Sequence, residues 1–562
     1  MEERGMINFF AKTNFQGRET VFGIKERDRK KHMHFIGKTD SGKTELLLNM
    51  AAQDMRNGKG VLIVDSEGDL AQKCLLAVPR ERAEEVVYFN LADSGFPVAF
   101  NFLEKINPDS RLMAAEQLVE IFKKLMGEKW NHRTHYLLKN IFLSLMEYPS
   151  ATLLGVEKFL ADDSYRQKVV STVRNQEVRQ FWTEEFSRYY SQIFDQAIIP
   201  LQKTIRPILN HATLRNIIGQ STSQLKLENA LANRQIVILD LSSGRNGEKI
   251  GYLLGSLFLA KLQLASLEGS EKKNDFHVYI DELQSFINNS FSNFLRDLSR
   301  QEIGVVSTNQ FVFQIETGLW QDIFKNVSTI GFFQLSKNDV NFFEKEGGFI
   351  FPEQYLNQAK PFHLFLRLAI DGRSSNPFMA ETLAPMSFSA GDLQRVDELV
   401  SLSRKKFGQI KEEVEVKINQ WLGSREELFK KIREIAEKQA KIKKKTKKKP
   451  IRFFDFEDDS QEQFFEIDCW GCGVKSEIPF RPDGESPVFC KNCLREYRKA
   501  QSQIEQQKQK KTKTLSKEDK QLIRKIKKSN SRYSKSKLPV RVKKEIDHVG
   551  LRKMIEAAME KN

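Results

Sequence analysis

The stretch HMHFIGKTDSGKTELLLNM, residues 32–50, decides the fold of this chain. Within it, residues 37–44 read GKTDSGKT and match the pattern G-x-x-x-x-G-K-[ST] at every fixed position. A short apolar run precedes the glycine loop and a segment with helical spacing follows it. This strand–loop–helix context is the one that a phosphate-binding loop requires. The stretch therefore predicts a nucleotide-binding loop next to a sheet.

The residue types in the loop suit ATP and Mg²⁺. Gly37 and Gly42 let backbone N–H groups curl around a polyphosphate, Lys43 is expected to reach the β- and γ-phosphates, and Thr44 is expected to ligate Mg²⁺. The residues predicted to hold the nucleotide are Gly37, Lys38, Thr39, Asp40, Ser41, Gly42, Lys43 and Thr44.

A second acidic position is expected, because a phosphate loop needs a carboxylate at the metal and another at the attacking water. HVYIDE, residues 277–282, is an apolar strand that ends in two adjacent carboxylates. We expect Asp281 to hold the water bound to the metal and Glu282 to act as the catalytic base. Asp65 and Asp240 also end apolar runs, but neither has a neighbouring carboxylate in that arrangement, which makes them weaker candidates.

Two further side-chain types are candidates for the catalytic site. Gln310 closes the next apolar run, where it would sense the γ-phosphate or orient water; an ordinary capping amide is the alternative. Arg296 and Arg300 lie on the helical segment before that run. Either is a candidate for an arginine supplied to a neighbouring subunit, which would stabilise charge in the transition state, and an exposed helical arginine is the alternative.

The pattern along the chain predicts an α/β fold with a helical insertion. Strand-length apolar runs alternate with helical segments in residues 32–93 and again from 235, which predicts a parallel sheet. Between about 105 and 232 only helical spacing occurs, and residues 388–440 read as long charged helices. The expected domains are 1–104 and 233–387 for the two parts of the core, 105–232 for the insertion, 388–450 for charged helices and a basic linker, 451–499 for a cysteine module, and 500–562 for a basic disordered tail.

The charge of the chain is concentrated near its C-terminus. Residues 441–562 hold 33 Lys and Arg against 18 Asp and Glu, which is +15 of the total net charge of +16. A basic segment favours phosphate-rich partners such as DNA through counterion release, with a solvated tail as the alternative. No apolar run approaches the roughly 18 residues of a membrane span, and residues 1–10 lack a signal-peptide core, so we expect a cytoplasmic protein.

Four of the five cysteines form a metal-binding pattern. They are Cys469, Cys472, Cys490 and Cys493, spaced C-x₂-C, seventeen residues, C-x₂-C. Four thiolates at this spacing predict a closed tetrahedral Zn²⁺ site in a small zinc ribbon. Two disulfides or a thiol redox pair are the rival interpretations. Basic and aromatic residues lie around the cysteines, so the module is expected to contact either nucleic acid or protein.

Several of these segments together resemble the type IV secretion coupling ATPases of the HerA–FtsK superfamily. They are the phosphate loop with VLIVDSEGDL, VYFNLADSGFPVAFNFLE (87–104), LSSGRNGEKIGYLLGSL (241–257), VYIDELQSF (278–286) and LAIDGRSSNPFMAETL (368–383). The resemblance implies a RecA-like P-loop core with an inserted all-helical domain, a homohexamer, and ATP-driven DNA translocation through a central pore. It also implies that Gln310 is the γ-phosphate sensor and that Arg300 is the better finger candidate.

The functional hypothesis is an ATP-driven hexameric motor that moves DNA, with a zinc module and a basic tail that capture it. Coupling proteins usually carry N-terminal membrane helices and this sequence shows none, so a membrane secretion channel as partner rests on the resemblance alone. A P-loop motor that acts on protein substrates or pili is one alternative. A nucleic-acid-binding scaffold with slow regulatory nucleotide turnover is another.

Overall fold

The computed structural model describes residues 7–15, 18–188, 193–242, 247–268, 275–352, 355, 360–422, 465–468 and 475–478. The chain divides into two compact units, residues 1–446 and 447–562. All the nucleotide-site candidates lie in the first unit. The four paired cysteines and the basic tail fall outside the described residues, so the zinc-site geometry and the expected disorder of 500–562 stay predictions.

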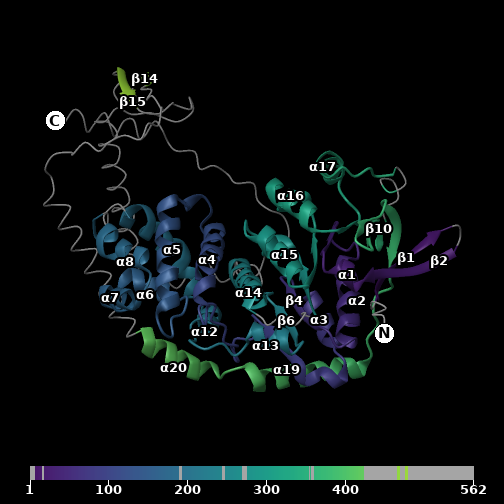
Figure 1. Cartoon of the computed structure of the whole chain (residues 1–562), viewed down its shortest axis with the longest axis horizontal. Coiled ribbons are helices and arrows are strands. Elements are labelled where there is room, and N and C mark those ends of the chain that lie inside the picture. Colours follow the sequence, from purple (N-terminus) through teal and green to yellow (C-terminus); the bar gives the residue numbers. More distant parts are fainter. Residues whose placement is uncertain are drawn as a thin grey trace, which may run out of the picture. The chain divides into compact units, whose positions relative to one another are not determined.

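One large sheet organises the first unit, and the described part of the chain contributes eleven strands to it (Figure 1). Their order is β2-β1-β13-β10-β9-β3-β8-β7-β4-β6-β5. The strands from β9 to β5 pair in parallel, as the alternation of strands and helices predicts. They are β3 Met33–Ile36, β4 Gly60–Asp65, β5 Val86–Asn90, β6 Ile236–Asp240, β7 Phe276–Asp281, β8 Gly304–Asn309 and β9 Thr329–Phe332.

An antiparallel extension continues the sheet beyond β9. The extension is formed by β10 His363–Arg367, β13 Phe378–Thr382 and the hairpin of β1 Ile7–Phe15 and β2 Arg18–Lys25. The sequence predicted a parallel sheet and did not predict this hairpin or the antiparallel pairing. A two-residue pair, β11 Ala369–Ile370 with β12 Arg373–Ser374, forms a separate small ribbon.

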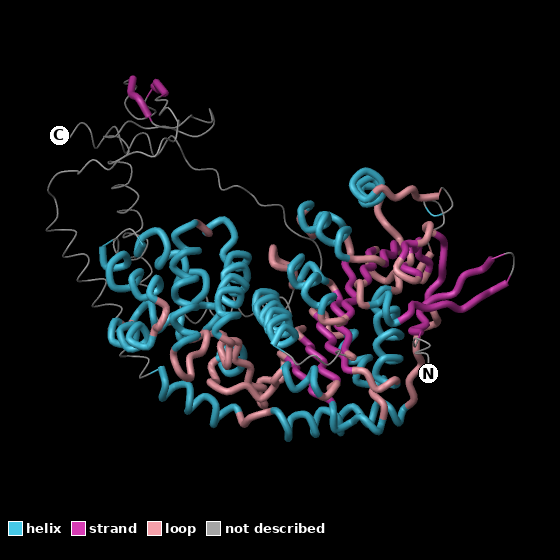
Figure 2. Tube along the Cα trace, viewed as in Figure 1, coloured by secondary structure: helices cyan, strands magenta, loops and turns pink. Residues whose placement is uncertain are grey.

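Helices cover both faces of the sheet (Figure 2), and the central strands are therefore buried on both faces. On β4, Val61 and Ile63 join the core on one face, and Leu62 and Val64 join the core on the other. The first face carries α2 Lys43–Arg56 and α3 Asp69–Ala77. The second face carries α14 Glu248–Glu268, α15 Phe291–Arg300, α16 Thr317–Asn326 and α17 Lys337–Gly347.

Among the described residues, α14 alone is long and apolar enough to cross a membrane by length and composition. However, 94% of its most apolar window is buried inside the protein, so its hydrophobicity is accounted for by the core. Gly255 on this helix lies so close to Phe286 that a Cβ atom would come within 2.3 Å of the ring. The helix therefore packs tightly against the segment that follows β7.

The segment between the two parts of the core is helical throughout its described residues, as expected. Its first helix, α4 Arg111–Met126, packs against α14 and so joins the insertion to the sheet. The other helices are α5 His132–Glu147, α6 Gly155–Ala161, α7 Asp163–Thr172, α8 Gln176–Gln180, α9 Phe186–Arg188, α11 Ile199–Leu209, α12 Ala212–Ile218 and α13 Leu227–Ala232, with π-helical turns at Phe181–Glu185 and Phe194–Ile198.

Two helices after the core connect the sheet with the insertion (Figure 1). The first, α19 Ala390–Phe407, packs against α3 and β5, where the Ser403 hydroxyl accepts the Tyr88 N–H at 2.9 Å. The second, α20 Lys411–Leu422, packs against α12, and its Trp421 carbonyl accepts a hydrogen bond from Lys158 of α6 at 2.6 Å. Charged helices are therefore found over residues 390–407 and 411–422 of the segment where they were expected, and they link the sheet to the helical insertion.

In the second unit, β14 Phe465–Asp468 and β15 Lys475–Ile478 pair as an antiparallel hairpin. Asp468 pairs with Lys475, so the positions of Cys469 and Cys472 fall between the two strands in the sequence.

Candidate nucleotide-binding and hydrolysis site

The glycine loop connects β3 to α2, and its two fixed glycines are required by their surroundings. Gly42 has φ +106°, and a Cβ there would lie 2.7 Å from Cδ1 of Phe362. A Cβ at Gly37 would lie 2.5 Å from the Cβ of Phe333. Any other residue at either position would force the loop away from its neighbours, so the loop keeps a cradle of backbone at the N-terminus of α2.

Lys43 is the first residue of α2 and folds back over the loop. Its ammonium donates hydrogen bonds to the carbonyl oxygens of Gly37 at 2.7 Å and Lys38 at 2.9 Å. Burial lowers the pKa of Lys43, and nearby carboxylates, with Glu282 and Asp281 foremost, act in the opposite direction. The cation is therefore placed inside the loop with acidic side chains close to it.

Thr44 and Asp281 meet at the other side of the loop. The Thr44 hydroxyl donates to Oδ2 of Asp281 at 2.9 Å, and the Thr308 hydroxyl donates to Oδ1. Both oxygens of Asp281 are thus held, and burial raises the pKa of this carboxyl group. A hydroxyl and a carboxylate in contact form the hard oxygen donor set that Mg²⁺ prefers.

Glu282 follows β7 in a left-handed backbone conformation, with φ +57°. Its N–H donates to the hydroxyl of Thr308 at 3.2 Å, and its side chain accepts a hydrogen bond from Nε2 of Gln284. Glu282 is buried. A non-glycine residue in this conformation is strained, and such strain is typical of sites where a side chain must be aimed precisely.

Gln310 also lies at the loop, because β8 is inserted between β3 and β7 in the sheet. Oε1 of Gln310 faces the hydroxyl of Thr39 at 3.5 Å, and its backbone N–H is directed at Oε1 of Gln314 at 3.3 Å. The structure therefore brings the candidate sensor next to the phosphate loop.

Arg296 and Arg300 lie on α15, and the structure does not place either at the loop of its own chain. Both approach Oδ1 of Asp297 at 3.8 Å, and Arg296 also donates to Asn293. Their side chains are 52% and 69% exposed, which leaves them accessible to another subunit. The choice between them stays a prediction.

Asp65 and Asp240 end the two strands beyond β7, in register with Asp281. Asp65 accepts the N–H groups of Glu67 and Ala71, both at 2.9 Å, and burial raises its pKa to about 6. Asp240 accepts the hydroxyl of Tyr88 at 3.0 Å. Both carboxylates accept hydrogen bonds from the protein itself. They were also the weaker candidates for a catalytic role in the sequence.

Three residues of the site were not predicted from the sequence: Glu67, Gln284 and Thr308. Partial desolvation raises the pKa of Glu67, and the neighbouring Glu282, Asp281 and Asp65 act in the same direction. Its position two residues after the strand-ending Asp65 is the signal that could have identified it. Thr308 and Gln284 carried no signal of their own, since their roles depend on which strands are neighbours.

Two family models match this sequence. Residues 20–208 match the model described as "Type IV secretion-system coupling protein DNA-binding domain". Residues 462–498 match the model described as "Probable treble clef zinc finger". This second match covers all four paired cysteines and confirms a zinc-binding module, with the treble clef as the family's description of it.

Solved structures share the fold at low sequence identity. The plasmid coupling protein TrwB in complex with a non-hydrolysable ATP analogue is 14% identical, with a TM-score of 0.50 over 69% of this chain and 91% of TrwB. TrwB in complex with ADP and Mg²⁺ is 13% identical, with a TM-score of 0.50 over 68% and 96% of the two chains. Among curated proteins, no sequence matches this chain. The chain therefore has a P-loop motif on a fold shared with TrwB, a segment over residues 20–208 that is similar to the DNA-binding domain of type IV secretion coupling proteins, and a segment over residues 462–498 that is similar to a treble clef zinc finger.

Proposed function

We propose that the chain hydrolyses Mg²⁺-ATP and uses the energy to move DNA, as a homohexamer in the cytoplasm. The observation that carries the proposal is the convergence of Lys43, Thr44, Asp281 and Glu282 at one edge of the sheet, in a chain matched by a coupling-protein DNA-binding domain. Bound nucleotides in TrwB support the choice of ATP, since the folds correspond.

The residues present fit a nucleotide and its metal. The glycine loop leaves a backbone cradle that a Cβ would fill, and Lys43 can exchange its two loop carbonyls for phosphate oxygens. Thr44 would ligate Mg²⁺, and Asp281 would hold the water bound to the metal. The metal would neutralise charge that develops on the phosphates. The loop amides from Lys38 to Thr44 would orient the same oxygens.

The remaining groups would act on the attacking water and on the leaving phosphate. Glu282 would take the proton of the water, and its left-handed backbone places it directly after the end of β7. Gln310 would contact the γ-phosphate from the adjacent strand end. An exposed arginine of α15, with Arg300 preferred, would complete the site of the neighbouring subunit and so make hydrolysis depend on assembly.

DNA is the proposed substrate because two independent features favour it. The family that matches residues 20–208 is defined as a DNA-binding domain, and residues 441–562 carry nearly all the net positive charge. The zinc finger lies within that basic segment of the sequence. We propose that the segment captures DNA and that the ATPase core moves it; a membrane secretion channel is the proposed partner of this activity.

One assay separates this function from its rivals. The rate of ATP hydrolysis by the full chain is measured without DNA, with single-stranded DNA and with double-stranded DNA. A DNA-driven motor is expected to hydrolyse ATP faster with at least one of the two. Hydrolysis that neither form of DNA changes would favour a motor that acts on protein substrates, and absence of turnover would favour a regulatory nucleotide site.

A further inference from the structure

The catalytic glutamate is hydrogen-bonded to a residue two positions later in the chain. Nε2 of Gln284 donates to Oε2 of Glu282, while Oε1 of Gln284 is buried and has no partner among the described residues. In this arrangement, one oxygen of the Glu282 carboxylate, Oε2, is already occupied and the side chain is tethered to the turn that follows β7.

The segment that carries Gln284 is anchored by the helical insertion. Lys124 of α4 donates from its ammonium to the carbonyl oxygens of Ile287 at 2.7 Å and Gln284 at 3.2 Å. The ammonium also lies 4.8 Å from the centre of the Tyr252 ring. The turn Leu283–Ser285 is 3₁₀-helical, and a lysine at the carbonyl end of a helical turn is favourably placed.

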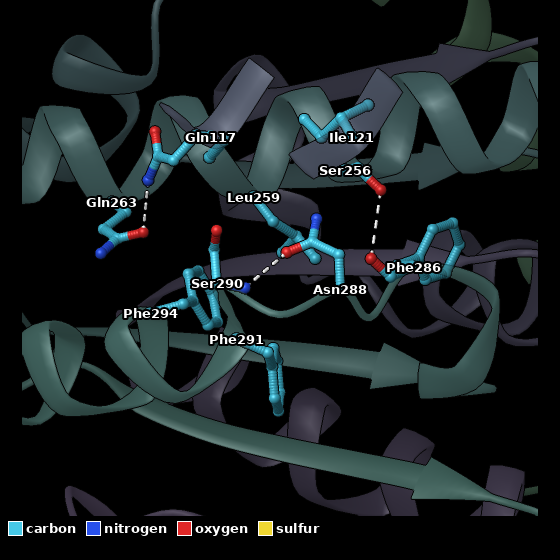
Figure 3. A pocket seen from close by; sticks show the side chains of 11 residues that line it. Gln117, Ile121, Ser256, Leu259, Gln263, Phe286, Asn288, Ser290, Phe291 and Phe294 are labelled. Carbon is cyan, nitrogen blue, oxygen red and sulfur yellow. Dashed lines mark hydrogen bonds between the residues drawn. The ribbon is translucent and has the colours of Figure 1, made fainter. Parts of the chain in front are cut away.

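The same helix reaches the arginine-bearing helix through buried amides. Nε2 of Gln117 on α4 donates to Gln263 at 2.6 Å, and Nε2 of Gln263 donates to Oδ2 of Asp297 at 2.7 Å. Figure 3 shows Gln117 and Gln263 joined by this hydrogen bond, and both line a small cavity of about 30 Å³ whose other lining residues include members of α4, α14 and α15. Oδ1 of the same Asp297 lies near both candidate arginines. A shift of α4 would therefore disturb both the 284–287 segment and α15, which carries the candidate arginines.

A cleft lies beside Gln284 into which its side chain could move away from Glu282. This cleft of about 630 Å³ is lined by Glu67, Lys124, Tyr252 and Gln284, among other residues. Because Oε1 of Gln284 has no partner where it is, moving this side chain into the cleft gives up one hydrogen bond and frees a buried acceptor.

We propose that Gln284 holds Glu282 in a resting position and that Lys124 makes this restraint depend on the position of α4, so that the helical insertion regulates hydrolysis. Gln284 and Lys124 are then positioning residues. DNA engaged by the insertion would shift α4, weaken the hold of Lys124 on the 284–287 segment and release the glutamate. This inference rests on the proposed function, because it assigns a regulator to the same site.

The test uses the full chain and three substitutions. Gln284→Ala removes the hydrogen bond, Lys124→Met removes the anchor but keeps the length of the side chain, and Lys124→Arg keeps donors for the two carbonyls. The matched control is Lys123→Met, on the same helix, because Lys123 pairs with Glu120 instead of the 284–287 segment. For each variant, kcat and KM for ATP are measured with and without double-stranded and single-stranded DNA, and binding of a fluorescent ATP analogue is titrated.

Gln284→Ala and Lys124→Met should each raise the DNA-independent kcat by about three- to tenfold, the factor that one hydrogen bond of ordinary strength is worth. KM and analogue binding should stay unchanged, and stimulation by DNA should fall by the same factor because the basal rate has risen. The double variant should exceed neither single variant, since both remove one restraint. Lys124→Arg and Lys123→Met should resemble the parent chain.

A basal kcat that stays constant or falls in both Gln284→Ala and Lys124→Met would overturn the inference, as would equal effects of Lys124→Met and Lys123→Met. A variant that merely damages the fold would weaken analogue binding together with kcat, which is the reverse of the expected pattern. If the parent chain hydrolysed no ATP, the proposed function itself would fail. Hydrolysis by the parent with no change in these variants would refute the regulatory inference alone.

Discussion

Thr44 and Asp281 are joined by a hydrogen bond of 2.9 Å although 237 positions separate them in the chain. Thr44 is the second residue of α2, Asp281 ends β7, and β8 lies between the strands that lead to them. The Thr308 hydroxyl near the end of β8 holds the other oxygen of Asp281. This candidate metal-binding pair is therefore built by the order of three strands, and the catalytic predictions follow from this arrangement.

Replacing Glu282 by Gln should reduce turnover by about a hundredfold or more, the contribution of a general base, while ATP binding is kept. The amide preserves the shape of the side chain but cannot take a proton from water. Single-turnover hydrolysis and titration of a fluorescent ATP analogue measure the two properties separately. Glu19→Gln, an exposed substitution on the β1–β2 hairpin, is the control. Hydrolysis near the parent rate in Glu282→Gln would show that another group is the base.

Replacing Lys43 by Ala should weaken ATP binding as well as turnover, because Lys43 contacts the phosphates before the reaction begins. Its ammonium now lies on two loop carbonyls, at 2.7 and 2.9 Å, and is free to exchange them for phosphate oxygens. Equilibrium binding of the same fluorescent analogue to Lys43→Ala and Glu282→Gln makes the comparison. Equal affinity of these two variants would contradict the assignment of Lys43.

Mixing Arg300→Ala subunits with Glu282→Gln subunits should restore part of the activity that each variant lacks alone. An arginine that acts on the neighbouring site is intact in one subunit type, and the base is intact in the other, so a mixed interface contains both. Titrating one variant into the other and measuring hydrolysis tests this. Arg296→Ala is the matched comparison, because both arginines lie near Asp297. Rings shown to be mixed that recover no activity would exclude Arg300.

The parallel core could be predicted from the sequence because its strands are buried on both faces. The first apolar run after 235 forms β6 Ile236–Asp240, and the segment with helical spacing after the glycine loop forms α2 Lys43–Arg56. Apolar runs of this length bounded by Gly, Asp or Ser have few alternatives. The β1–β2 hairpin was missed, since Phe9 and Val21 are exposed and the run therefore lacks a continuous buried pattern.

The site itself was only partly predictable. Lys43, Thr44, Asp281, Glu282 and Gln310 carry local signals, because each lies at a fixed offset from a glycine loop or a strand end. Contacts between residues far apart in the chain produce no local pattern in the sequence. Lys124 meets the carbonyl of Gln284 from 160 positions away, and an exposed lysine on a helix predicts nothing about its partner.

Acidification should destabilise the core through His34, whose ring is fully buried between Ser307 and Asn309. Burial lowers the pKa of His34 to about 4, whereas the unfolded chain has the ordinary value of 6.5. Between these values the unfolded state binds the proton first, so stability present above pH 6.5 is lost as pH falls toward 4. From pH 6.5 to 5.5 the loss is about 1 kcal/mol. Urea unfolding of the parent and His34→Gln at pH 7.0 and 5.5 should show a smaller loss in the variant, and equal losses would contradict this.

Deleting residues 441–562 should separate capture of DNA from hydrolysis, because it removes +15 of the +16 net charge and the zinc finger but none of the nucleotide-binding residues. DNA-independent hydrolysis should survive, while DNA affinity and its dependence on salt should both fall.

For a protein that neutralises Z phosphates, log K decreases with log salt at a slope of about −0.9Z on duplex DNA, so loss of several contacts flattens the slope by several units. Salt titrations of DNA binding for the full chain and the truncation measure this. A truncated chain to which residues 452–498 are restored should regain little of the slope, since this segment holds 6 Lys and Arg against 11 Asp and Glu and is therefore net acidic. Identical slopes for the full chain and the truncation would mean that the basic segment does not touch DNA and serves only as a solvated tail.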